Sequence, residues 1–311
     1  MDPLISILIP CHNAAPFIAA TLESALAQTW PKREIIVVDD GSTDDSLALA
    51  RRFESRGVQV LDQPNRGASA ARNRALQAAR GDYFQFLDAD DLLSPKKIAA
   101  QLAVLATRAP GTLGSCRWGR FTTDPAQAVF AAEAVFRDFS PIEFLQVHTG
   151  TGHMMHPGSW LVPRAVAEQA GPWNEKLSLN DDGEYFARVV LASAGIAFAP
   201  APAASYYRSG LSGSLSQRRS KTALASLALS IELIAQHLTA ADNSPRTRQA
   251  LADYWQRLVY ELYPGDLAGS RQAESRAAAL GGSRVPPPLG YRQHRLARFI
   301  GWRLVYRIFR S

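Results

Sequence analysis

Three aspartates close an apolar, aromatic-rich segment of this chain. The run from Asp82 to Leu87 is followed by Asp88, Asp90 and Asp91. A buried strand that ends in carboxylates brings negative charge to the carboxyl edge of an open α/β sheet, which is where such sheets bind ligands. Carboxylates two residues apart on a turn can share one divalent cation, and hard oxygen ligands favour Mg²⁺ or Mn²⁺. Such a cation would hold a phosphate-bearing substrate, whereas an isolated Asp-x-Asp would equally suit a solvated acidic turn.

Polar residues follow two other strand-like segments. The first segment ends in Pro10-Cys-His-Asn13, and the second ends in Asp39-Asp-Gly-Ser42. In a parallel sheet these ends lie along one edge and can converge on one ligand. Asp40 can accept a hydrogen bond from a base N–H, and Gly41 lets the chain turn close to that ligand. Taken alone, the second set would equally suit a turn followed by a helix cap.

A phosphate bound near Asp40 needs neutralising groups, because a carboxylate repels it. The candidates are a cation at Asp90 and the side chains of Arg66 and Arg72. The sequence therefore predicts a site for an anionic nucleotide, in which a carboxylate binds the base while a cation and arginines neutralise the phosphates.

The elements that must position these residues alternate over the first hundred residues. Apolar runs predict strands, and apolar residues at helical spacing predict the helices between them. Asn13 is expected to cap the first helix and Gly81 to end the third. Repeated β-α units with short connections predict an α/β fold with a mainly parallel sheet flanked by helices. Strands are predicted at 4–9, 34–38, 58–61 and 82–87, and helices between Asn13 and Trp30, at 44–56, at 67–80 and from Pro95 onward.

The pattern is less regular after about residue 110. A short strand is predicted at 159–162 and a helix at 180–191, whose acidic first turn suits a helix N-terminus. Residues rich in Ala and Leu predict a C-terminal helical extension, and three consecutive prolines predict a linker after it. We therefore expect an α/β domain over 1–215, a helical extension over 216–280, a linker over 281–290 and a basic tail over 291–311.

Composition narrows the class of protein. The 311 residues are 47% hydrophobic and 20% charged, which is typical of a globular protein. The net charge of +6 makes nucleic acid and anionic membranes partners to consider. The two cysteines, Cys11 and Cys116, exclude a disulfide framework and fit a reducing compartment. We find no signal peptide, and the apolar stretches 189–204 and 223–238 are too short or too interrupted to span a membrane, so we expect a cytoplasmic protein.

Taken together, these residues resemble the family 2 glycosyltransferases, whose catalytic domain has the GT-A fold. Four matching stretches occur in the family's order and at its spacing, namely Ser6–Asn13, Gln28–Asp44, Asn65–Asn73 and Gly81–Asp91. The resemblance is strong over 4–105 and thinner over 150–210. We find no resemblance after about residue 220.

The resemblance implies roles for the matching positions. Asp90 would bind Mn²⁺ or Mg²⁺, which bridges the diphosphate of a nucleotide-sugar donor. Asp91 would assist in the site or cap the next segment. His12 stands where the family more often has an aromatic ring against the base. The residues around the nucleotide sugar would be Pro10, His12, Asn13, Asp39, Asp40, Arg66, Arg72 and Asp88.

The catalytic base is expected in the second half of the chain. The segment from Asn180 to Arg188 is similar to the family's acidic motif, and Asp182 matches the base. Asp181 stands where Glu is commoner and Gly183 where a larger residue is usual. The two aspartates alone would also suit the capping of a helix N-terminus.

Three histidines lie between the expected metal site and the expected base. His148, His153 and His156 occur on a stretch rich in Gly and Met and without cysteine. Their spacing is a weak signal for zinc, so we expect a loop that lines the acceptor cleft. Arg208 is expected to contact phosphate or to pair with the acidic edge of the sheet.

The expected reaction is a single displacement. Asp182 would take the proton of an acceptor hydroxyl as it attacks the sugar, and the anomeric centre would invert. The acceptor would be a surface polysaccharide or a lipid-linked precursor. Two alternatives remain: a sugar nucleotidyltransferase, although residues 10–16 lack the glycines and basic residues of its phosphate loop, and a catalytically degenerate membrane-associated scaffold.

The last twenty residues form a basic amphipathic tail. Residues 291–310 carry six arginines and no acidic residue, with Trp302, Leu304 and Phe309 on the face opposite most of them. A cationic amphipathic helix binds anionic membrane surfaces, which would place the protein on the inner face of the plasma membrane. The alternative is a helix packed on its own domain. Nucleic acid is not expected as a partner, because no aromatic residues are interleaved as a binding surface.

Overall fold

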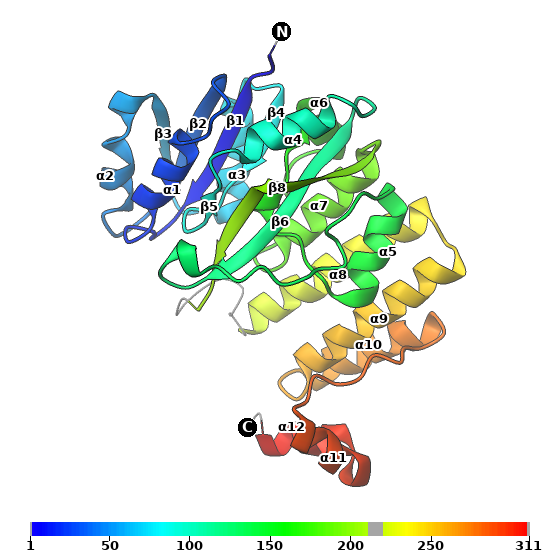
Figure 1. The fold of residues 1–311 in the computed structure, drawn as a ribbon. Helices are drawn as coiled ribbons and strands as arrows, with labels where there is room; N and C mark the ends of the chain where they lie inside the picture. Colours follow the sequence, from blue (N-terminus) through cyan, green and yellow to red (C-terminus); the bar gives the residue numbers. More distant parts are fainter. Residues whose placement is uncertain (1, 211–219, 310–311) are drawn as a thin grey trace.

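A five-stranded sheet organises the first half of the computed structural model, which describes residues 2–210 and 220–309 (Figure 1). The strand order is β3-β2-β1-β4-β7, and the first four are parallel. The α/β fold with a mainly parallel sheet is therefore confirmed. The strands are β1 (Ile5–Cys11), β2 (Arg33–Asp40), β3 (Val58–Gln63), β4 (Tyr83–Phe86) and the antiparallel β7 (Val162–Pro163).

Helices cover both faces of this sheet. Along β1, Leu8 packs against the face covered by α3, while Ile7 and Ile9 pack against the side of α1 and α4. This alternation explains why every residue of β1 is apolar or buried, since a strand covered on both sides exposes neither set of side chains. The helices are α1 (Ile18–Leu26), α2 (Ser46–Arg51), α3 (Ala68–Ala78) and α4 (Lys97–Leu105).

Two expected capping residues have other roles. Asn13 does not cap α1, whose N-cap is Phe17, but lies in the loop after β1 with φ 51°. Gly81 does not end α3 in a left-handed conformation, because α3 ends at Ala78 and its C-cap, Ala79, is extended. A Cβ on Gly81 would stand 2.6 Å from the backbone nitrogen of Ser6. Gly81 therefore permits the close approach of this turn to β1.

A second sheet has the order β5-β8-β6, and none of its three strands is among those predicted from the sequence. Its strands are β5 (Leu92–Leu93), β6 (Thr112–Phe121) and β8 (Gly195–Arg208). Pro200 and Pro202 in β8 are a local signal against a strand, because proline cannot donate to a ladder. The register jumps from Cys116 opposite Ala199 to Arg117 opposite Ala204, so both prolines lie outside the pairing with β6.

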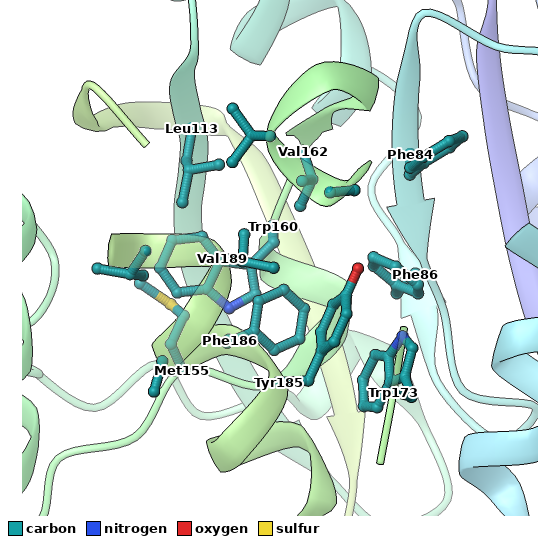
Figure 2. Close-up of a cluster of buried hydrophobic side chains, with 14 of the residues drawn as sticks. Phe84, Phe86, Leu113, Met155, Trp160, Val162, Trp173, Tyr185, Phe186 and Val189 are labelled. Carbon is teal, nitrogen blue, oxygen red and sulfur yellow. The ribbon is translucent and has the colours of Figure 1, made fainter. Parts of the chain in front are cut away.

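An aromatic core joins β4 to the helices of the second half (Figure 2). Phe86 packs edge-on against Trp173, Tyr185 and Phe186, with ring centroids 5.4, 5.6 and 5.8 Å away. Trp173 and Tyr185 stack at 4.0 Å. Each such pair contributes about 0.5–1.5 kcal/mol beyond the area that it buries. The helices here are α5 (Pro141–Thr151), α6 (Arg164–Ala170) and α7 (Asp181–Ala192).

The aromatic core matters for the site because of where its members lie in the chain. Phe86 comes two residues before Asp88, and Tyr185 comes three residues after Asp182. Packing these rings together therefore brings the end of β4 close to the beginning of α7. Of the strand expected at 159–162, only Val162 belongs to β7, because residues 157–159 form a 3₁₀ turn.

Three helices follow the two sheets: α8 (Lys221–Ala241), α9 (Pro245–Leu262) and α10 (Leu267–Ala279). The expected boundary at 215/216 falls outside the described residues. By length and composition, α8 could cross a membrane, with a mean hydropathy of 1.4. This corrects the expectation for residues 223–238, which counted only part of the helix. In the structure 44% of that window is buried, and Ile234 and Leu238 belong to the main core.

The expected single C-terminal helix is two helices, α11 (Tyr291–Ile300) and α12 (Trp302–Phe309). Gly301 separates them at φ 78°, a left-handed conformation that favours glycine. The rings of Trp302 and Tyr306 pack against Tyr260 of α9 and Tyr263, the residue that follows this helix. Part of the face that was assigned to the membrane thus faces the protein. Arg310 lies outside the described residues.

Candidate functional site

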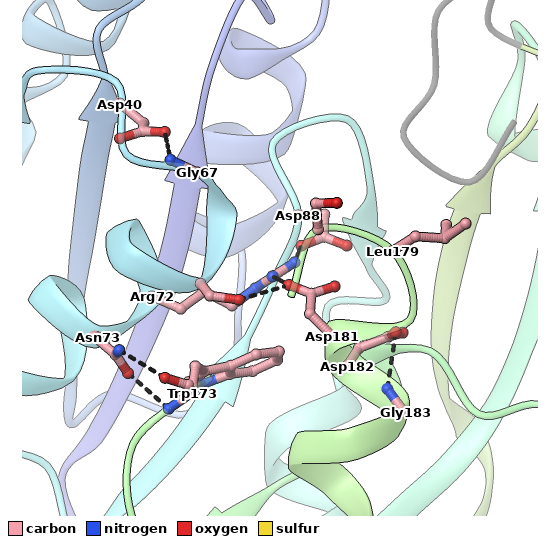
Figure 3. Close-up of polar contacts among 12 residues, drawn as sticks. Asp40, Gly67, Arg72, Asn73, Asp88, Trp173, Leu179, Asp181, Asp182 and Gly183 are labelled. Carbon is pink, nitrogen blue, oxygen red and sulfur yellow. Dashed lines mark hydrogen bonds and ion pairs between the residues drawn. The ribbon is translucent and has the colours of Figure 1, made fainter. Parts of the chain in front are cut away.

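Asp40 locks the loop that connects β3 to α3. Its Oδ1 accepts hydrogen bonds from Gln63 Nε2 at 2.7 Å and the Arg66 N–H at 2.9 Å, and its Oδ2 accepts from the Gly67 N–H at 2.7 Å (Figure 3). A carboxylate offers about four acceptor positions, so these three bonds leave it little capacity for a ligand. Asp40 therefore serves in this structure to hold the loop after β3 in place.

The other residues expected near the nucleotide base form hydrogen bonds with one another and with neighbouring turn residues. Asp39 accepts from the Ser42 N–H and hydroxyl at 2.9 and 2.6 Å, which is the turn that the sequence left open as an alternative. Asn13 Oδ1 accepts from the Thr43 N–H at 2.8 Å. His12 Nδ1 lies 2.9 Å from the carbonyl oxygen of Asp40. Pro10 is buried near the end of β1, so the structure brings all of these residues to one edge of the sheet.

The loop after β2 depends on a glycine. Gly41 has φ 68°, and a Cβ there would stand 2.7 Å from the backbone nitrogen of Asn65. The loops after β2 and β3 can approach this closely only because residue 41 has no side chain. Asn65 in turn lies 3.2 Å from the His12 ring, which completes the cluster.

Arg72 bridges two carboxylates from opposite halves of the chain. Its Nη2 donates to Asp88 and its Nη1 to Asp181, both at 2.8 Å (Figure 3). Its guanidinium lies 4.4 Å from the centre of the Trp173 ring, and only 7% of its side chain is exposed. Arg72 was expected to neutralise phosphate, yet here it neutralises two aspartates. Arg66, paired with Glu175 at 2.9 Å and 62% exposed, is the more accessible of the two arginines.

Asp90 and Asp91 differ in how the protein holds them. Buried Asp91 accepts from the Arg208 N–H at 2.8 Å and lies 3.5 Å from His156 Nδ1, so it braces the end of β8. Arg208 donates through Nε to the backbone carbonyl of Asp90, 3.0 Å away. Burial and the charges of Asp91 and Asp88 raise the pKa of Asp90 to about 7. Negative charge at Asp90 is therefore incompletely compensated by the protein.

The residues present suit a cation that a diphosphate helps to bind. Within 2–210 and 220–309, no group of three or more His, Cys, Asp and Glu side chains could hold a metal unaided. Mg²⁺ is usually bound by one or two carboxylates together with substrate phosphates, and Asp90 with its uncompensated charge fits that arrangement.

The three histidines do not form a zinc site. His148 belongs to α5 and stacks on Phe144, and its Nδ1 lies 2.7 Å from the carbonyl of His153. His153 pairs with Glu133. His156 is buried, with Nε2 2.8 Å from Ser205 Oγ, and burial lowers its pKa to about 4. Neutral His156 is thus a structural neighbour of Asp91, a role that the sequence did not reveal.

Asp181 and Asp182 begin α7, and they differ in what they contact. Asp181 accepts from Ser69 Oγ at 3.0 Å in addition to Arg72, so it is committed to the protein. Asp182 is partly buried and accepts from the Gly183 N–H at 2.9 Å. Burial and the charge of Asp181 raise the pKa of Asp182 to about 6. A carboxylate in this condition can accept a proton near neutral pH.

The chain belongs to glycosyl transferase family 2, whose model matches residues 6–170. Over 105 residues it is 42% identical to the UDP-Glc:alpha-D-GlcNAc-diphosphoundecaprenol beta-1,3-glucosyltransferase WfaP of Escherichia coli, a match that spans 33% of this chain and 42% of WfaP. Over 93 residues it is 43% identical to the uncharacterized glycosyltransferase YibD of Escherichia coli K12, spanning 29% of this chain and 27% of YibD. The chain thus matches less than half the length of either relative.

Solved structures show that the fold likeness extends beyond the family motifs. Staphylococcus aureus TarS 1–349 in complex with UDP-GlcNAc superimposes with a TM-score of 0.74 at 18% identity, covering 99% of this chain and 91% of that one. The mannosyltransferase PcManGT of Pyrobaculum calidifontis, solved with GDP-Man and Mn²⁺, gives 0.58 at 20% identity over 98% and 83%. The GT-A type fold expected from the sequence is confirmed, and the likeness to TarS includes the helices after residue 220.

Proposed function

We propose that this protein transfers a sugar from a nucleotide-diphosphate sugar to a hydroxyl acceptor with inversion. One observation carries the proposal: Arg72 pairs with one member of each of two sets of aspartates, one set after β4 and the other at the start of α7, and the two sets suit different chemical tasks. On one side Asp88 is paired with Arg72, and Asp90 beside it offers negative charge for a cation-bound diphosphate. On the other side Asp181 holds Arg72 and leaves Asp182 free to act on an acceptor.

The chain's own residues divide the reaction into two tasks. On the donor side, the loops held by Asp39 and Asp40 border the nucleotide, and Asp88 and Asp90 face its diphosphate. A divalent cation at Asp90 would stabilise the charge that develops on the leaving diphosphate. On the acceptor side, Asp182 takes the hydroxyl proton while the acceptor oxygen bonds to the anomeric carbon and the bond to the diphosphate breaks. One displacement inverts the anomeric centre.

The substrates follow from the relatives as part of the same proposal. TarS was solved with UDP-GlcNAc and PcManGT with GDP-Man and Mn²⁺, so we infer a nucleoside-diphosphate sugar donor and a Mn²⁺ or Mg²⁺ cofactor. The name of WfaP describes a diphosphoundecaprenol-linked acceptor. We infer a saccharide or lipid-linked acceptor in surface-polysaccharide synthesis.

A panel of UDP-, GDP-, dTDP- and CDP-sugars tests this function. We expect Mn²⁺-dependent release of the nucleoside diphosphate from one of them, and loss of that release in Asp90→Ala. Asp62→Ala is the matched control, because Asp62 is an exposed aspartate on β3 that pairs with Arg51 of α2. NMR of the glycoside product should show inverted anomeric configuration. If no donor is bound or hydrolysed with or without metal, the degenerate scaffold is the better account.

We also propose that α11 and α12 bind an anionic membrane surface from the cytoplasmic side. Phe299 is 87% exposed, and Leu304, Ile308 and Phe309 are also exposed. Five arginines accompany these apolar side chains, and residues 291–309 contain no acidic residue. An arginine contributes about 1 kcal/mol near an anionic leaflet, and Arg303 would contribute less because it is paired with Glu274. In Figure 1 the helix pair lies at the lower end of the molecule, on the side toward which β1 runs.

Vesicle sedimentation tests the membrane surface. The full-length protein is expected to sediment with phosphatidylserine-containing vesicles at low salt and to be released at high salt, because the attraction is screened. Phe299→Asp should weaken this binding strongly. Val129→Asp is the control, since Val129 is an exposed apolar residue between β6 and α5. Equal binding by both variants, or no binding by the unaltered protein, would contradict the proposal.

A further inference from the structure

The segment that leads into the two aspartates of α7 is fastened to helix α8. Ser226 Oγ accepts hydrogen bonds from the N–H groups of Ser178 and Leu179 at 2.8 and 3.0 Å, and it lies 3.2 Å from the carbonyl of Leu179 as a donor. One hydroxyl therefore satisfies three backbone groups of the loop. Ser226 is 7% exposed, so water does not easily replace these bonds.

Asn180 is held in an uncommon conformation by the same helices. Its φ is 59°, a left-handed value that costs conformational energy and persists where surrounding contacts impose it. Its Nδ2 donates to Ser230 Oγ of α8 at 2.8 Å and to the Tyr254 hydroxyl of α9 at 3.3 Å. Two residues from separate helices thus fix the side chain of the residue before Asp181.

The glycine after Asp182 belongs to this arrangement. A Cβ on Gly183 would stand 2.4 Å from Asn180 Oδ1. The inward position of the Asn180 side chain therefore requires glycine at 183, where the family usually has a larger residue. This explains the departure from the family pattern by a contact that the sequence could not show.

A third contact lies one turn further along α7. Buried Glu184 pairs with Arg188 at 2.7 Å and lies 3.4 Å from His237 of α8. Ser226, Ser230 and His237 are four and seven residues apart, which places them along one side of α8. We call this the loop-facing side of α8. It contacts the chain at residues 178–180 and at residue 184, on either side of the two aspartates.

We propose that α8 and α9 are a positioning device for Asp182: Ser226, Ser230 and Tyr254 fix the loop at 178–180 and thereby aim the carboxylate at the acceptor. The inference rests on the proposed role of Asp182 as base. The donor-side residue Asp40 ends β2, and Asp90 lies on the loop after β4. Loosening the loop should therefore slow transfer and leave donor binding intact.

Two variants loosen the loop without placing a larger side chain in it. Ser226→Ala removes the hydroxyl, and Asn180→Gly keeps the left-handed backbone but removes the amide that Ser230 and Tyr254 hold. Ser220→Ala is the matched control, because Ser220 caps the N-terminus of α8 through the Ala223 N–H and does not bond the loop. It should lower the stability of the helix without changing the aim of Asp182.

Steady-state kinetics and amide hydrogen exchange together decide the proposal. We expect kcat to fall about 10- to 100-fold in Ser226→Ala and Asn180→Gly, since small misplacements of a catalytic group cost that much, with KM for the donor nearly unchanged. Exchange of residues 178–184 should accelerate in both. The acid limb of the kcat profile should move to lower pH, because a more hydrated Asp182 has a lower pKa. Ser220→Ala should show none of these changes.

Two outcomes would overturn the positioning role. In the first, loop exchange accelerates while kcat is unchanged, which would mean that the contacts hold the loop but not the base. In the second, Ser220→Ala loses as much activity as Ser226→Ala, which would mean a general loss of folding. Failure of the proposed function is recognised separately: Asp182→Asn would then retain transfer, whatever the loop variants do.

Discussion

Replacing Asp182 by asparagine is expected to abolish most sugar transfer, with kcat lower by about 10²–10⁴-fold, the usual contribution of a general base. Asparagine has nearly the same shape but cannot accept the proton of the acceptor hydroxyl. Asp181→Asn is the matched comparison, because Asp181 is the adjacent carboxylate of the same helix and its side chain is already committed to Ser69 and Arg72. The rate of product formation at saturating donor and acceptor measures the effect. Full activity in Asp182→Asn would remove this residue from the role of base.

The same carboxylate should set the acid limb of the pH profile. Burial and the charge of Asp181 raise the pKa of Asp182 to about 6, so the base is protonated and inactive below that pH and ionised above it. We expect kcat to rise through about pH 6 and to level off near neutral pH. The residual activity of Asp182→Asn should lack this limb. A wild-type profile that is flat from pH 5 to 8 would contradict the assignment.

Replacing Arg72 by methionine is expected to cause the largest loss of stability. Removing one partner of a buried ion pair typically costs about 3–5 kcal/mol, because the remaining charge is left uncompensated. Here two carboxylates, Asp88 and Asp181, lose the same cation. The variant also loses the contact with Trp173. Urea denaturation measures the free energy of unfolding.

A matched variant tests whether the loss of stability comes from the burial of the ion pair and not simply from removing an arginine. Arg51→Met breaks the pair with Asp62, in which both side chains are more than half exposed, and should cost about 0–1 kcal/mol. Converting Asp181 to asparagine in the Arg72→Met background should restore part of the loss, because one stranded charge is removed. Equal losses in Arg51→Met and Arg72→Met would show that the Arg72 pairs are not significantly buried in solution.

The sequence was sufficient for the first sheet because local signals and the fold agreed there. β1 and β2 are apolar runs that end in turn residues, and β2 pairs with β1 and β3, its neighbours in the chain order of β-α units. The second sheet was different. β8 contains Pro200 and Pro202, and only the register jump opposite Cys116 makes them acceptable. That jump is a property of pairing between distant segments and leaves no local pattern.

In the site, too, local sequence signals were sufficient for some features and not for those that depend on distant segments. The aspartates at the strand ends could be found from their spacing, yet their individual duties depend on partners about a hundred residues away. Arg72 and Asp181 meet across 109 positions. Asn180 meets Ser230 across 50 positions. The one available signal was a pair of serines four residues apart in the apolar sequence of α8, and it became meaningful only when the helix was placed beside the acidic motif.

We propose above all that Asp90 and Asp182 perform separate tasks, with Arg72 pairing Asp88 near the first and Asp181 near the second. Calorimetric titration with UDP and with GDP, each with and without Mn²⁺, tests it most directly in the wild-type protein, Asp90→Ala and Asp182→Asn. We predict Mn²⁺-dependent binding of one nucleotide to the wild type, nearly equal binding to Asp182→Asn, and loss of the Mn²⁺-dependent part in Asp90→Ala. Equal loss in both variants, or Mn²⁺-dependent binding that survives in Asp90→Ala, would contradict the division of tasks.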